Sequence, residues 1–493
     1  MSNRKTWPAL AALTLLLTAA CGGGGAGGGG APIGTPNPPG GGGTPPPDPL
    51  LGINGGGAWN AFGPLSTFGS IVVIGVRYAV DDAQFLVNGQ PATQADLAQG
   101  QVVFVVGDVD EGGLTGRAER VIYEHNVRGS VTAIDLAARR LTVLGQQVQV
   151  GVDTLFGPSI PPEGLAALVV GDAVTVSGFV DSSGHVAATR VDRDAAPGTA
   201  EVRGPVSGLD VAATRFQVNG LAVDYGSAVL EGFPGGVPQD GDIVFVRGPS
   251  PLAGEPLVAS LLAWRAAGVD AEVEDNVFIE GLVTAFSSTT DFAVAGQPVV
   301  TTANTVFVGN SLQRLGRDAL VSVEGSLDAQ QRLVAVRVTV VPRADTEIEA
   351  QVDSVDLEAG IIRMLGIDVY VNARTRYADD DDDLPLSLAS LRAGDGVEVA
   401  GYLLDGHFIA VRVERDDDGI GEVEIEGPIG ALAEPEFRIA GIRILTDAFT
   451  EFERNDQTIN AAEFFAEALG LMAEVDGQWN GEAVIAGKVE LQE

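Results

Sequence analysis

One unit recurs along the chain, and this repetition limits the possible folds more than any other feature of the sequence. Each copy opens with a short segment centred on a small residue: "TFGSI", "VRGSV", "VRGPV", "IEGLV", "IEAQV" and "IEGPI". A second segment ends in glycine, at Gly89, Gly145, Gly220, Gly296, Gly366 and Gly441. A third runs from glycine to glycine, as in "GDAVTVSG", and the copy closes on an Ala-x-x-apolar segment such as "ATRV". A chain of this kind is expected to fold as an array of similar units.

The segments alternate apolar and polar residues, which is typical of half-buried β-strands. In the third copy Phe216 and Val218 would face one side of a sheet, and Gln217 and Asn219 the other. The glycine that ends the second segment suits a tight hairpin turn with positive φ. Four copies then carry a Thr-x-aromatic pair, and a short helical stretch such as "AAEFFAEALG" precedes the third segment. Each unit therefore reads strand, strand, strand, short helix, strand, strand.

This element order predicts an all-β fold of six tandem OB-like small β-barrels, with a helix between the third and fourth strands of each. A small open β-sandwich is the alternative. Closure into a barrel would remove the exposed strand edges of so short a sheet. We expect the units to be joined by linkers as beads on a string, and we number them repeats 1 to 6, at residues 62–125, 126–196, 199–268, 275–342, 346–416 and 421–493.

The repeat resembles a bacterial domain of unknown function that occurs in tandem in secreted lipoproteins. The resemblance rests on the glycine-marked first strand, the "F-x-V-x-G" hairpin, the "G-x-x-V-x-V-x-G" strand and the final "A-x-x-V". It implies export and an all-β fold. It implies no activity and carries over no functional residue.

The start of the chain reads as an export signal over residues 1–20. Arg4 and Lys5 precede a short apolar run, and Thr18-Ala19-Ala20 leads directly to Cys21, the single cysteine of the chain. This resembles a bacterial lipobox, with threonine in place of the usual leucine, and predicts that Cys21 is lipidated. An ordinary export signal cleaved near Ala20 is the alternative. Gly22 after the cysteine favours sorting to the outer membrane, on a side that the sequence leaves open, and residues 21–61 form a Gly/Pro-rich linker.

Charge limits the partners of the chain. The formal net charge is −38 and the isoelectric point is about 4.2. Such a field repels nucleic-acid phosphates, so nucleic acid is excluded as a partner. The partners that we expect are a membrane, through the N-terminal lipid, and an unknown envelope protein or glycan. With one cysteine, the chain can form neither internal disulfides nor a multi-cysteine metal site.

The sequence assigns no catalytic and no cofactor-binding residue, so we predict that the protein is not an enzyme. His125, His185 and His407 lie in three different repeats, and the chain has neither a G-x-S-x-G elbow nor a phosphate-binding glycine loop. The one candidate ligand set lies in "YADDDDDLP" and comprises Asp379, Asp380, Asp381, Asp382 and Asp383. Calcium prefers several oxygen ligands on a loop, so weak Ca²⁺ binding is a candidate, and a solvated acidic loop is the alternative.

Together these features predict a lipid-anchored protein of the bacterial cell envelope whose β modules act as a structural or ligand-binding scaffold. An adhesin, or a surface lipoprotein that binds glycans or Ca²⁺, is the alternative. An enzyme with a site assembled across modules is a third hypothesis.

Overall fold

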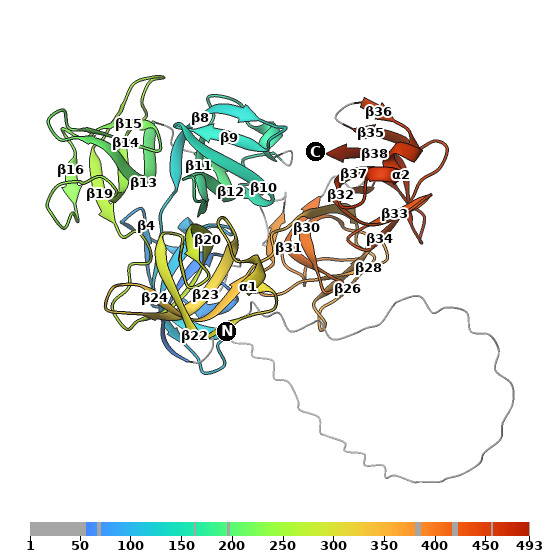
Figure 1. Ribbon diagram of the computed structural model, residues 1–493, viewed down its shortest axis with the longest axis horizontal. Helices are drawn as coiled ribbons and strands as arrows, with labels where there is room; N and C mark the ends of the chain where they lie inside the picture. Colours follow the sequence, from blue (N-terminus) through green and yellow to red (C-terminus); the bar gives the residue numbers. More distant parts are fainter. Residues whose placement is uncertain are drawn as a thin grey trace, which may run out of the picture. The chain divides into compact units, whose positions relative to one another are not determined.

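The computed structural model describes residues 56–66, 71–161, 164–194, 198–379, 386–416, 423–454 and 457–492. The described part is almost entirely β-structure, which confirms the all-β prediction (Figure 1). The short helices there are η1 (Gln94–Asp96), η2 (Gly164–Ala167), α1 (Ser311–Arg314) and α2 (Ala461–Glu467). Within the described ranges, no helix has the length and apolar character needed to cross a membrane.

The strands form three sheets, and each sheet is shared by two repeats. The sheet of repeats 1 and 4 contains β1 (Gly57–Pro64), β2 (Ile71–Val73), β3 (Val76–Ala79), β4 (Gln84–Val87), β5 (Gln90–Ala92), β6 (Val102–Val109), β7 (Thr115–Tyr123), β20 (Asn276–Ser288), β21 (Asp291–Val294), β22 (Gln297–Phe307), β23 (Leu320–Leu327) and β24 (Leu333–Val340). The sheet of repeats 2 and 3 contains β8 (Val127–Asp135), β9 (Arg140–Val143), β10 (Gln146–Phe156), β11 (Ala173–Val180), β12 (Val186–Arg193), β13 (Thr199–Asp210), β14 (Arg215–Val218), β15 (Leu221–Asp224), β16 (Val229–Glu231), β17 (Ile243–Pro249), β18 (Leu257–Val258) and β19 (Leu261–Arg265). The sheet of repeats 5 and 6 contains β25 (Thr346–Gln351), β26 (Ser354–Asp356), β27 (Ile361–Met364), β28 (Ile367–Tyr370), β29 (Arg376–Asp379), β30 (Gly396–Leu404), β31 (His407–Asp416), β32 (Val423–Ala433), β33 (Glu436–Ile439), β34 (Ile442–Leu445), β35 (Glu451–Arg454), β36 (Gln457–Ile459), β37 (Met472–Trp479) and β38 (Val484–Gln492).

Within a repeat the strands pair in a ring. In repeat 2, β8 pairs with β9, and β9 forms a hairpin with β10. Strand β10 runs parallel to β12, and β11 is antiparallel to both β12 and β8. Repeat 4 has the same ring in the order β20-β21-β22-β24-β23. The ring leaves no strand of the unit with two free edges.

The repeats are nevertheless not separate OB-like barrels on a string, and that prediction is wrong. The first strand of each repeat also pairs with the first strand of another: β1 with β20, β8 with β13, and β25 with β32. Figure 1 shows the blue strands of repeat 1 beside the yellow strands of repeat 4. The units are joined by backbone hydrogen bonds between strand edges, as the units of a β-solenoid are. The long first strands explain the difference, because the edge that each leaves free within its own unit needs a partner.

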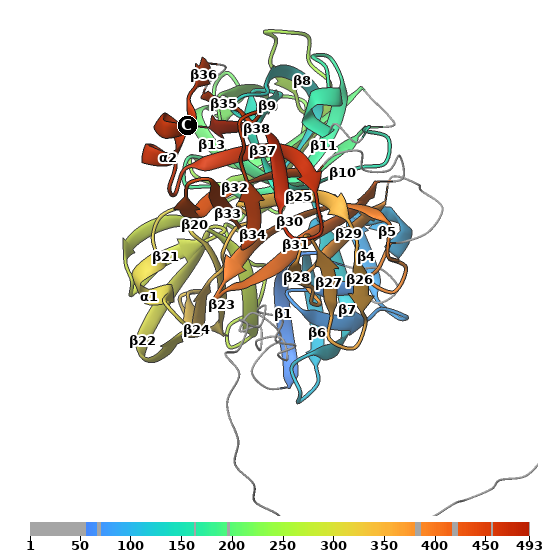
Figure 2. The same ribbon diagram turned by 90° about the vertical axis from the view of Figure 1, so that its right-hand side faces the viewer.

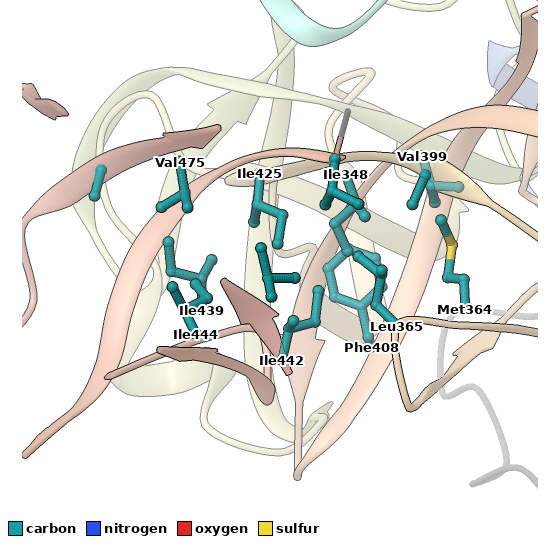
Figure 3. Close-up of a cluster of buried hydrophobic side chains, with 14 of the residues drawn as sticks. Ile348, Met364, Leu365, Val399, Phe408, Ile425, Ile439, Ile442, Ile444 and Val475 are labelled. Atoms are coloured by element: carbon teal, nitrogen blue, oxygen red, sulfur yellow. The ribbon is translucent and has the colours of Figure 1, made fainter. Parts of the chain in front are cut away.

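The apolar cores follow the same pairing. One buried cluster takes Ile348, Val399 and Phe408 from repeat 5 and Ile425 and Ile439 from repeat 6 (Figure 3). The strands that contribute to this cluster are β25, β30 and β31 of one repeat and β32, β37 and β38 of the other, and Figure 2 shows them side by side. A second cluster is shared in the same way by repeats 2 and 3. The repeats of these two pairs therefore bury apolar surface together, so none of the four is expected to be fully stable alone.

Two glycines per unit have clear structural causes. The hairpin glycine lies in a turn with positive φ at both central residues, as at Leu144 (φ 49°) and Gly145 (φ 77°), which confirms the predicted tight turn. The glycine near the end of the third segment lies at a β-bulge. At Gly178 a Cβ would stand 2.1 Å from the carbonyl oxygen of Ala187, and the register shifts between Ser177 and Gly178.

In repeat 1 the first strand and its hairpin lie at other residues than the sequence pattern predicts. The sequence pattern assigns Gly69 to the first strand, but Gly69 lies outside the described residues. The structure places the first strand at β1, where a Cβ on Gly63 would stand 2.6 Å from the side chain of Ile74. The following hairpin turns at Gly75, and the "FLVNG" segment at Gly89 forms an additional hairpin, β4–β5. Two hairpin signals lie close together in this repeat, and sequence alone did not separate them.

The predicted helical stretch before the third segment is helical in several repeats. In repeat 6, α2 begins with a capping box, in which Asn460 Oδ1 accepts a hydrogen bond from Glu463 N and Glu463 Oε2 accepts one from Asn460 N. In repeat 5 the described residues 386–394 form turns instead.

Candidate functional site

The threonine of the Thr-x-aromatic motif has the same role in four repeats. Its hydroxyl donates a hydrogen bond to the carbonyl oxygen of the alanine in the closing Ala-x-x-apolar motif. The donor–acceptor pairs and their distances are Thr154–Ala188 (2.8 Å), Thr305–Ala335 (2.6 Å), Thr375–Ala410 (2.9 Å) and Thr450–Ala486 (2.8 Å). The hydroxyl also accepts a hydrogen bond from the backbone N–H three residues earlier, for instance from Asp447 to Thr450 at 2.9 Å. The most regular polar residue of the repeat therefore holds two strands together.

Beside this threonine lies a surface depression that we call the strand groove. It is bounded by the loop before the threonine, the strand with the bulge glycine and the closing strand. In repeat 6 the strand groove is an open cleft of about 450 Å³. Its lining includes Asp447, Phe449, Asp476, Gln478 and Lys488. The side chain of Phe449 is 88% exposed, an unusual state for a large aromatic ring.

The equivalent groove of repeat 5 is covered. The register identifies the equivalent residues, since Tyr402 pairs with Ile409 in repeat 5 as Gln478 pairs with Ile485 in repeat 6. Only about 80 Å³ of space remains there, and Asp153, Phe179 and Thr189 of repeat 2 contribute to its walls. Those three residues belong to the strand groove of repeat 2, so the two grooves face each other.

Charged side chains join these two grooves. Arg376 of repeat 5 donates hydrogen bonds to the carboxylate of Asp153 at 2.9 Å and to its backbone oxygen at 2.7 Å. Beside it, Arg374 bonds to the buried carboxylate of Glu280 in repeat 4, which also accepts a hydrogen bond from Ser322 Oγ at 2.9 Å. Charges buried in this way need partners, and here the partners come from other repeats.

A second buried cation lies on the sheet of repeats 5 and 6. Arg412 bonds to Glu347, Glu398 and Glu414, and its Nε donates to the backbone oxygen of Val152 in repeat 2 at 3.1 Å. Burial and the neighbouring carboxylate of Glu398 raise the pKa of Glu347 well above its ordinary value, against the opposing effect of Arg412. This site contains too few cations for its carboxylates, so Arg412 is essential to its balance.

His125 takes part in a contact that its sequence position did not reveal. Its Nδ1 lies 3.0 Å from the carboxylate of Glu201 in repeat 3, which also accepts hydrogen bonds from Asn88 at 2.9 Å and Arg247 at 2.6 Å. Burial opposes ionisation of Glu201, but the hydrogen bonds from His125 and Arg247 leave its pKa below the ordinary value. This arrangement joins repeats 1 and 3, because Glu201 accepts hydrogen bonds from residues of both repeats.

The acidic residues singled out from sequence lie at the edge of what the structure describes. The backbone of Asp379 ends β29, but its side chain and the whole of Asp380 to Asp383 lie outside the described residues, as does Cys21. The Ca²⁺ and lipidation predictions therefore stay predictions.

Another carboxylate cluster lies within the described part. Oxygen atoms of Glu424, Glu474 and Asp476 lie within 4.8 Å of one another on β32 and β37. Desolvation and the neighbouring carboxylates raise the pKa of Glu424 to about 7. Sequence reasoning missed this cluster because the strand pairing, and not the spacing along the chain, brings its members together. The signal available in sequence was the alternation of "VEIEG" and "AEVDG", which places acids on one face of each strand.

Fold and contacts define a class of protein: an all-β tandem-repeat array in which several buried charged side chains bind one repeat to another. Comparison with family models matches residues 128–192, 280–339, 349–414 and 426–490 to a domain of unknown function, DUF5666. These segments cover just over half of the chain, and the protein belongs to this family. The comparison with curated proteins finds no match. The family model matches four repeats, not six, and these are the four that carry the threonine described above.

Proposed function

We propose that this protein is a lipid-anchored scaffold of the bacterial cell envelope. The observation that supports the proposal is that recurrent and buried polar side chains bond strands and repeats to one another. The recurrent threonine holds strands together, and the buried side chains of Arg376, Arg412 and Glu201 each bond to a residue of another repeat. A repeat that devotes such groups to assembly is suited to a rigid body that positions or presents a surface.

The lipid anchor rests on the chain's start. Cys21 follows an apolar segment and small residues, and a Gly/Pro-rich stretch separates it from the repeats. A lipid on this cysteine would place the repeat array at a membrane surface, with the Gly/Pro stretch as a tether. Outer-membrane sorting is part of the proposal, because Gly22 follows the cysteine.

The test is the variant Cys21→Ala in bacterial cells fed a labelled fatty acid. The parent chain should incorporate the label and fractionate with outer membranes, and C21A should do neither. The matched control is Thr18→Leu, which supplies the usual lipobox leucine and should keep the label. Membrane association of C21A equal to that of the parent would contradict the anchor, and labelled C21A would contradict the assignment of the modified residue.

A further inference from the structure

The contact between repeats 2 and 5 shows what a strand groove of this chain can bind. The grooves of repeats 2 and 5 face each other, and Arg376 crosses from one to the other to reach Asp153 and the carbonyl oxygen of Thr189 at 3.4 Å. The backbone oxygen of Val152, in the groove of repeat 2, also accepts a hydrogen bond from Arg412 of repeat 5. Strand ends of repeats 1 and 4 complete the enclosure at Pro64 and Leu320.

The groove of repeat 6 has the same construction and no such cover among the described residues. Its cleft measures about 450 Å³, against the 80 Å³ that remains between repeats 2 and 5. The position of Arg374 in repeat 5 is occupied here by Phe449, and that of Arg376 by Glu451, as the shared strand register shows. Repeat 6 therefore has an apolar ring where repeat 5 has an arginine that forms an ion pair, and this Phe449 ring is 88% exposed. Exposed aromatic side chains of this kind are typical of protein interfaces.

The lining of this groove combines an exposed aromatic ring with charged side chains. Asp447, Glu451 and Asp476 line the cleft together with Lys488, whose Nζ is held by Glu453 at 3.1 Å and by Glu490 at 2.8 Å. A two-fold axis through this surface would place the two Phe449 rings together and cover apolar surface that one copy leaves exposed. The contact between the strand grooves of repeats 2 and 5 shows that two such grooves can pack against each other.

We propose that two copies of this chain associate through the strand groove of repeat 6, each inserting Phe449 into the groove of the other. The proposal does not depend on the lipid anchor, because it concerns residues of the repeat array alone.

Cysteine cross-linking tests the proximity. Gln478→Cys keeps Phe449 and lies in the groove, and Phe449→Cys lies at its centre, so both variants of the full chain should give a reducible dimer on mild oxidation. The matched control is Leu252→Cys, at an apolar side chain 80% exposed in repeat 3, and the parent chain controls for Cys21. Absence of the dimer from both groove variants, or an equal yield from L252C, would overturn the proposal.

Sedimentation of the detergent-extracted full chain tests the energetics. The parent should show a concentration-dependent dimer, and Phe449→Asp should weaken it by at least about tenfold in dissociation constant, since a buried aromatic anchor typically contributes that much. Leu252→Asp should leave it unchanged. Because both sites are exposed, neither change is expected to unfold the chain, and circular dichroism of each variant checks this. A parent chain that stays monomeric, or an F449D chain that dimerises as the parent does, would refute the inference.

Discussion

The bulge glycine of repeat 6 gives the sharpest test of how the repeat is built. A Cβ on Gly477 would stand 2.5 Å from the carbonyl oxygen of Ile485 and 2.7 Å from a methyl group of Val484. Real Cβ atoms essentially never approach another atom within 3.0 Å, so Gly477→Ala must move the strands apart by at least about 0.5 Å. Strand β37 is paired on both sides, with β32 and β38, which leaves it little freedom to yield. We expect a loss of about 2–3 kcal/mol, as for overpacking of a rigid site.

The matched control is Gly487→Ala, in the closing strand of the same repeat. Its Cβ would meet nothing nearer than the Asp476 carbonyl oxygen at 3.6 Å, so the change should be neutral or should stabilise by a few tenths of a kcal/mol. Hydrogen exchange of peptides from β37 and β38 measures local opening, which remains well defined when an array does not unfold in one step. A cost of 2–3 kcal/mol corresponds to roughly 30- to 150-fold faster exchange in G477A. Equal exchange in the two variants would refute the close-approach argument.

Three further changes probe the charges and the recurrent threonine. Arg412→Met should lower the free energy of unfolding in urea by about 3–5 kcal/mol, because Glu347, Glu398 and Glu414 lose the arginine that they share. The loss should be larger at neutral pH than in acid, where the carboxylates are protonated. The control is Arg215→Met, which breaks the exposed ion pair with Asp224 and should cost under about 1 kcal/mol. Glu424→Gln should stabilise the protein by about 1 kcal/mol near pH 8 and have no effect near pH 4. The raised pKa of Glu424 in the folded state makes the stability of the parent fall as the pH rises from 4.5 toward 7, and solvent at this exposed side chain screens part of that effect. A change in stability that does not depend on pH would contradict the prediction. Thr450→Val should cost about 1–2 kcal/mol by leaving the Ala486 carbonyl without its donor, and thermal unfolding equal to the parent's would show that the bond contributes nothing.

Much of the repeat could be predicted from sequence because its cues are local. The alternation at Phe216 to Val218 and the turn at Gly220 depend only on neighbours in the chain, and the structure has a strand and a tight turn there. The sequence shows a repeated glycine at Gly178, but it does not predict the bulge there, because the bulge depends on the carbonyl group of Ala187 on another strand. The joining of repeats was missed altogether. It depends on strand edges and on ion pairs, such as that of the buried Arg376 with Asp153, that no spacing rule connects.

The pairing of β1 with β20 has a consequence for how the chain matures. Trp59 pairs with Asn276, so one edge of β1 has no hydrogen-bonding partner until β20, more than two hundred residues further along the chain, has been synthesised. Repeats 2 and 3, and repeats 5 and 6, are neighbours in the chain and can associate as soon as both exist. Repeat 1 must instead keep an unsatisfied strand edge open while two other repeats are synthesised, which is the period in which such an edge recruits wrong partners. The slowest and most vulnerable step of maturation is therefore expected at the first repeat to emerge, and a chain truncated before repeat 4 should aggregate through β1.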